Sequence, residues 1–238
     1  MNEHDADLRR WPHSRRAFLR SVGVAVGGIG LTSGTAVGQS ERPPDQFTLD
    51  IDNRYFPLPV GRRLLLEGDE EGVTVKLRVT VLDETENLGD VTTRVVEERE
   101  WEDGALLEVS RNYFAQSTEG DVWYFGEAVD IYEDGAVVSN EGSWRAYEDG
   151  NEPGVFMPAT PEVGMLYRQE RAPGVAEDKV LILGLDETVE VPAGTFENTL
   201  RTYDWNPLEP GTPGDVKVYA PSVGIIVDGA VELVEFVE

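Results

Sequence analysis

One stretch of this sequence occurs twice, and the repetition constrains the fold more than any other feature. Residues 77–101 read LRVTVLDETENLGDVTTRVVEEREW, and residues 180–205 read VLILGLDETVEVPAGTFENTLRTYDW. The shared LDET lies at residues 82–85 and 185–188, an offset of 103. An ordered series with a nearly constant offset predicts an internally duplicated unit, with convergent strand and turn composition as the alternative. Further matches at offsets of 103 to 105 pair Val60 with Val163, Glu67 with Glu170, Lys76 with Lys179, Trp101 with Trp205 and Phe114 with Tyr219.

The repeated stretches have the pattern of β-strands. Residues 74–82 alternate between apolar and polar side chains, which predicts a strand with one face on a core. Residues 180–185 are apolar on both faces and are expected to be covered on both sides. Asp-Gly at 103–104, 134–135 and 228–229 favours tight hairpins, and 119–121, 191–194 and 220–223 carry further turn signals.

These signals predict an all-β protein with about eleven or twelve antiparallel strands, because no segment shows a helical period over ten residues. We expect a single domain over residues 47–238, built from two similar halves at about 47–145 and 150–238. Each half alone would be a marginal core at this charge, whereas about 190 residues can bury roughly 70% of the unfolded surface. The architecture expected is a closed or partly open barrel, or a curved two-layer sheet.

The first 38 residues are expected to be an export signal. Arg15-Arg16 precede a weakly apolar run rich in Gly and Ala, and Ala36-Val37-Gly38 suits a cleavage site. This resembles a twin-arginine (Tat) signal, a receptor-read address, and predicts an extracellular or cell-surface protein. Residues 39–46 read as a polar linker, and no second apolar run of spanning length follows. Whether the signal is cleaved or kept as a tether stays open.

After residue 38 the chain holds 43 acidic residues against 15 basic ones, only three of which are lysines. Such charge makes a domain repel itself unless concentrated salt screens it, so we expect a halophilic protein from a salt-accumulating source such as a haloarchaeon. It also disfavours nucleic-acid partners. Both histidines lie before residue 38 and cysteine is absent, which excludes Ser-His-Asp and Cys-His catalysis, histidine-bound metals and disulfides from the exported chain.

Three kinds of side chain are candidates for function. Aromatic residues could line a ligand pocket, although the alternative is that they fill the core; the ligand-lining candidates are Trp101, Trp123, Phe125 and Trp144. Carboxylate pairs could support an extracellular hydrolase, and the repeated motif supplies Asp83, Glu84, Asp186 and Glu187. Acidic loops at 83–90 and 148–152 offer oxygen ligands but follow no known calcium loop. No catalytic residue, metal site or cofactor is predicted.

Two turn sequences carry a resemblance. VPAGTF at 191–196 and YAPSVG at 219–224, with YFPLPVG at 55–61 and GDVWYF at 120–125, are similar to an uncharacterised family of exported β-rich bacterial and archaeal proteins. Ser222 stands where the pattern has Gly. The resemblance implies an exported β fold and transfers no catalytic residue. We expect a non-enzymatic binding or envelope-associated module for an apolar or glycan ligand, with its partners unknown and a carboxylate-dependent hydrolase as the alternative.

Overall fold

The computed structural model describes residues 46–237, so the predicted signal, including Arg15 and Arg16, and the linker up to residue 45 lie outside the described residues. The described chain forms fifteen strands and no helix, and all pairings between named strands are antiparallel. This confirms the all-β prediction, although eleven or twelve strands was too low. The difference lies in short strands that pattern reading misses, such as β1 (Phe47–Thr48), β8 (Trp144–Arg145) and β10 (Leu166–Arg168).

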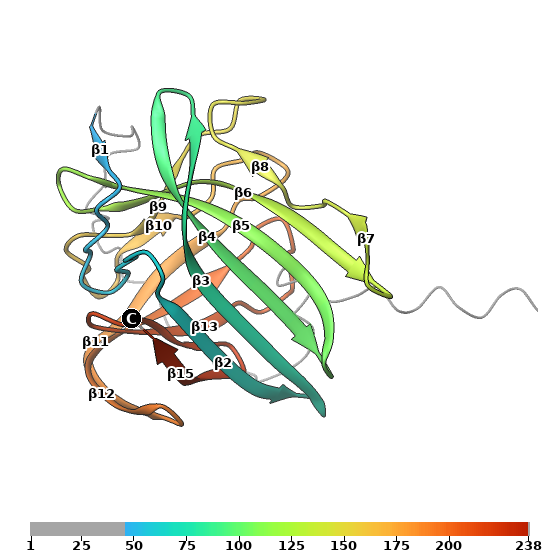
Figure 1. The fold of residues 1–238 in the computed structure, drawn as a ribbon. Helices are drawn as coiled ribbons and strands as arrows, with labels where there is room; N and C mark the ends of the chain where they lie inside the picture. Colours follow the sequence, from blue (N-terminus) through green and yellow to red (C-terminus); the bar gives the residue numbers. More distant parts are fainter. Residues whose placement is uncertain (1–45, 238) are drawn as a thin grey trace, which may run out of the picture.

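One sheet contains all fifteen strands (Figure 1). Its first half is a meander of β2 (Arg63–Glu70), β3 (Val73–Leu88), β4 (Val91–Glu102), β5 (Ala105–Ser117), β6 (Val122–Glu133) and β7 (Ala136–Ser139). Its second half runs through β10, β11 (Lys179–Val191), β12 (Gly194–Trp205), β13 (Asp215–Ala220), β14 (Gly224–Asp228) and β15 (Val231–Val237).

The two meanders meet where β15 pairs with β2, which gives the order β10-β11-β12-β13-β14-β15-β2-β3-β4-β5-β6-β7. Strands β1, β8 and β9 (Gly154–Met157) lie off this path, β1 against β5 and the other two against β6. The sheet is curved and does not close, because β10 and β7 do not pair with each other. The structure is therefore a curved all-β sheet and not a closed barrel.

The strand alternation sets the interior. In β3, Val75, Leu77, Val79 and Val81 are buried while their neighbours are half-buried or exposed, as the alternating pattern predicts. In β11 the expectation was wrong, since Val180 and Ile182 are buried but Leu183 is 41% exposed. One face of β11 is uncovered because the described residues place no second layer over it, and burial on both faces requires such a layer.

The Asp-Gly turns behave as expected at two of three places. Asp103 and Gly104 have φ of 47° and 83°, the left-handed values that a two-residue hairpin between β4 and β5 needs. Asp134-Gly135 repeats this between β6 and β7. Asp228 instead ends β14 opposite Val231, and the turn falls on the next two residues.

The two halves share local geometry. The amide of Gly61 donates to the carbonyl of Val81 at 2.9 Å, and the amide of Gly164 donates to that of Ile182 at 2.9 Å. Strands β4 and β12 also begin 103 residues apart and end 103 residues apart. The Leu-Asp-Glu-Thr motif interrupts regular strand pairing in both halves. The register of β3 against β4 shifts at the first copy, and the register of β11 against β12 shifts at the second. A common origin of the halves stays a prediction.

Candidate ligand-binding cavity

A cavity of about 150 Å³ lies inside the curve of the sheet, lined by residues of both halves. Four of its rings form one cluster. Phe114 stacks on Tyr124 with ring centroids 4.9 Å apart, and Phe156 meets Phe114 edge-on at 4.9 Å. Phe56 lies 4.3 Å from Phe156 and 5.2 Å from Phe114. These four residues, called the aromatic cluster below, make one wall of the cavity apolar and rigid.

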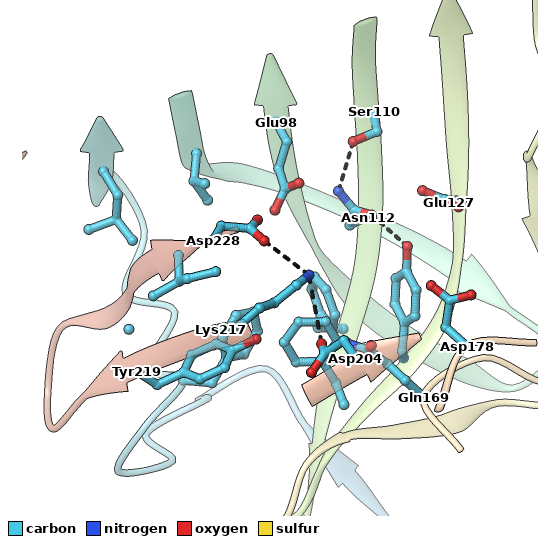
Figure 2. Close-up of a pocket in the computed structure, with 18 of the residues that line it drawn as sticks. Glu98, Ser110, Asn112, Glu127, Gln169, Asp178, Asp204, Lys217, Tyr219 and Asp228 are labelled. Atoms are coloured by element: carbon cyan, nitrogen blue, oxygen red, sulfur yellow. Dashed lines mark hydrogen bonds and ion pairs between the residues drawn. The ribbon is translucent and has the colours of Figure 1, made fainter. Parts of the chain in front are cut away.

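A buried polar network crosses the cavity wall on β5 and β6. The hydroxyl of Tyr124 donates to Asn112 Oδ1 at 2.5 Å, and Asn112 Nδ2 donates to Ser110 Oγ at 3.2 Å (Figure 2). Ser110, Asn112 and Tyr124 are each less than 7% exposed. Because alternate residues of a strand share a face, Ser110, Asn112 and Phe114 all face the cavity. The network fixes the ring of Tyr124 in the aromatic cluster.

Carboxylates dominate the charge of the cavity lining. Nine of them line the cavity, against two basic side chains, Arg62 and Lys217. The carboxylates are those of Glu98, Glu108, Glu127, Glu141, Glu170, Asp178, Asp204, Asp215 and Asp228. The cavity is thus apolar at the aromatic cluster and strongly anionic over the rest of its lining, including Glu108 and Glu127 on the strands that carry Phe114 and Tyr124.

Lys217 lies between two of these carboxylates. Lys217 Nζ is 3.7 Å from Asp204 Oδ2 and 3.4 Å from Asp228 Oδ1 (Figure 2). The register explains the arrangement, because Lys217 is directly opposite Thr202 on β12 and opposite Asp228 on β14. Thr202 Oγ1 donates to Asp204 Oδ1 at 2.6 Å. The ammonium of Lys217, on β13, thus links the two strands that flank it, β12 through Asp204 and β14 through Asp228.

Burial raises the pKa of Asp204 to about 6. The effect of burial is larger than the lowering of this pKa by the Lys217 charge and by the hydrogen bond from Thr202. The Asp228 and Asp178 charges also raise this pKa. Removal from water disfavours the charged carboxylate, and a neighbouring cation recovers only part of that loss. Asp204 therefore changes charge near pH 6 in the folded protein.

The substitution Asp204→Asn tests this. The carboxyl has a higher pKa folded than unfolded, so the stability that it contributes is complete below about pH 4 and is lost as the pH rises through 6. Two pKa units correspond to about 3 kcal/mol. Wild type loses this contribution as the pH rises and Asp204→Asn does not. We therefore expect the free energy of unfolding of the variant minus that of wild type to increase by about 2–3 kcal/mol from pH 4 to pH 7.5. Urea titrations in concentrated salt measure it, and a difference that does not change with pH would contradict the assignment.

The predicted ligand-lining rings lie elsewhere. Trp123 and Phe125 do share one face of β6, but it is the face opposite Tyr124 and away from the cavity. Phe47 of β1 covers them, with ring centroids 6.4 Å from Trp123 and 5.1 Å from Phe125. Both are at most 3% exposed, so they fill a second buried layer under β1.

Trp101 and Trp144 are also outside the cavity lining. Trp101 lies half-buried on β4 beneath the guanidinium of Arg78, 5.1 Å from its ring. Trp144 is buried and packs edge-on against Tyr124 at 5.4 Å, one residue behind the cavity wall. The four predicted rings are therefore not brought together, and Trp144 alone supports the cavity, through Tyr124.

The repeated carboxylates are on the surface. Asp83 is 90% exposed, and Glu84 makes an ion pair with Arg111 at 3.1 Å. Glu187 pairs with Arg201 at 2.8 Å, and Asp186 is exposed with a φ of 60°. None of the four lines the cavity. Each pair follows from a strand irregularity that turns a polar side chain outward.

Within residues 46–237, no group of three or more acidic side chains is arranged to hold a metal ion. No helix in this part of the chain is long and apolar enough to cross a membrane.

Burial raises the pKa of the Tyr167 hydroxyl well above its usual range, and the nearby charge of Asp204 raises it further.

Sequence reasoning missed the residues that line the cavity. Lys217 carried a signal, since it is one of three lysines after residue 38 and sits between apolar neighbours in residues 216–219. Asn112 carried no such signal, because the burial of its side chain is seen only in the structure. Neither was singled out as a candidate, because a polar residue in an alternating strand usually faces water.

Comparison with protein-family models, with curated proteins and with solved structures found no match to this chain.

Proposed function

We propose that this protein is an exported binding protein that holds a small ligand inside its curved sheet. The observation that carries the proposal is the cavity of about 150 Å³ that both halves line. Concave sites with an apolar wall and a few placed polar groups are the usual form of small-molecule sites. The adjacent arginines at residues 15 and 16 support export, to the cell surface or beyond.

The size of the cavity favours a compact ligand. An apolar cavity of about 150 Å³ is filled by benzene, whereas drug-sized ligands occupy about 300–1,000 Å³. A long lipid or an oligosaccharide would therefore place only one end inside. Of the two ligand classes expected from the sequence, an apolar group is favoured over a glycan for the part of the ligand that touches the aromatic cluster. Ser110 and Asn112 offer polar contacts beside that cluster.

The hydrolase alternative has less support. Its candidate acids, Asp83, Glu84, Asp186 and Glu187, lie on the surface, and at least three of them are near an arginine. An acid-base pair needs one carboxyl held in its protonated form, and burial of the kind seen at Asp204 is absent at these four.

A cavity-filling variant tests the binding function. Val129 is buried in β6 and lines the cavity, so Val129→Phe places a ring where the ligand would lie. Val138 is 52% exposed on β7, and Val138→Phe is the matched control. Wild type and both variants are purified at high salt from the original host, and extracted small molecules are measured by mass spectrometry.

We expect one compound at near-stoichiometric amounts in wild type and in Val138→Phe, and a loss of about tenfold or more in Val129→Phe. Equal amounts of the same compound in both variants would show that it binds elsewhere. No compound in any sample would leave the protein an envelope component without a small ligand, and would overturn the proposal.

A further inference from the structure

We infer that the ligand of the cavity is a small organic cation, an alkylated ammonium group with apolar substituents. This inference rests on the proposed binding function and names its ligand class. Its two supports are independent of each other: the rings of the aromatic cluster, and the sign of the charge over the rest of the cavity lining.

The aromatic cluster suits a cation that cannot donate hydrogen bonds. Ring faces carry negative charge, and several rings around one space form the usual cage for quaternary ammonium groups. Phe56, Phe114, Tyr124 and Phe156 all line the cavity, and Phe56 and Tyr124 each contact both Phe114 and Phe156. Tetramethylammonium has five heavy atoms, one fewer than benzene, and fits a cavity of this volume.

The charge of the cavity lining selects for a positively charged ligand. Nine carboxylates against two bases would repel an anion strongly, and a neutral ligand would leave this charge unused. Asp204 adds a specific feature, because its Oδ2 is buried, faces the cavity and accepts no hydrogen bond from the described residues. Its contact with Lys217 at 3.7 Å is an ion pair without a hydrogen bond. The wall already holds one ammonium group in this position.

The test compares three probes of nearly the same shape and different charge. Tetramethylammonium is the cation, tert-butanol the neutral molecule and pivalate the anion. Each is titrated into the full exported chain at constant ionic strength with sodium chloride as the balancing salt, and binding is followed by ligand-observed NMR. We expect tetramethylammonium to bind at least tenfold more tightly than tert-butanol, and pivalate to show no binding.

Two variants locate the effect. Phe156→Leu removes a ring of the aromatic cluster and keeps an apolar side chain, and we expect it to weaken tetramethylammonium about tenfold and tert-butanol less than threefold. Phe47→Leu removes a ring of similar burial from the outer layer over Trp123, and we expect no change with either probe.

The outcomes separate the two proposals. Tert-butanol bound as tightly as tetramethylammonium, with both lost in Val129→Phe, would keep the binding cavity and overturn the cation. Equal weakening of tetramethylammonium in Phe156→Leu and Phe47→Leu would place the cation outside the cavity and overturn the inference. Binding of none of the three probes would count against both.

Discussion

We expect the melting temperature of this protein to fall by about 10 °C or more when potassium chloride is lowered from about 3 M to about 0.03 M. The screening length grows from a few Å to roughly 20 Å over this range. The described chain shows where repulsion is concentrated. Nine carboxylates line one cavity, and at the end of β2 burial, with the nearby charges of Asp215, Glu71 and Glu102, raises the pKa of Glu70 to about 7.

Two controls separate screening from other effects of salt. Sucrose stabilises folded proteins without screening charge, so it should restore less of the melting temperature than salt does at equal water activity. Lowering the pH to about 5 in dilute salt should restore part of it, because the raised folded pKa of Glu70 and Asp204 means that their stability is lost only as the pH rises through 6 to 7. A melting temperature that is independent of salt would show that the charge is harmless.

The strands and their faces could be predicted from the sequence to different extents. The alternation in β3 identifies the strand and groups Val75 with Leu77, because pattern and burial are both local. The sequence also separates Tyr124 from Trp123 and Phe125. Which of these side chains faces the cavity is decided by a distant segment, since Phe47 lies 76 residues before Trp123 and covers the outer face of β6.

The ion pairs of the cavity lining could not be predicted for a similar reason. Asp204 and Lys217 are ordinary polar residues in their own strands, and they become a site only because β12, β13 and β14 pair in one register. The curl of the sheet then brings them opposite Phe114 and Tyr124 of the first half. Register and curl depend on contacts between distant segments, which the local patterns of a single sequence do not reveal.

The substitution Lys217→Met is expected to have a large effect on stability. It removes the cation between Asp204 and Asp228, whose side chains are 8% and 12% exposed, and leaves two carboxylates of like charge without the ammonium that lies between them. Breaking a buried pair by removing one partner costs about 3–5 kcal/mol, because the remaining charge is desolvated without compensation. For a domain of this size this lowers the melting temperature by roughly 10 °C. Urea denaturation at pH 7.5 in concentrated salt measures the free energy of unfolding.

Lys76→Met is the matched control for this substitution. Lys76 pairs with Glu67 at 3.0 Å on the outer face, and both side chains are more than 40% exposed, so we expect a loss below about 1 kcal/mol. The pH dependence identifies the cause in Lys217→Met. Without the ammonium the pKa of Asp204 rises further, so the loss should be largest at pH 7.5 and should shrink near pH 4.5, where the carboxyl is protonated in the folded state. A loss of equal size at both pH values would mean that the lysine stem stabilises the fold by packing alone, and that the two carboxylates need no cation.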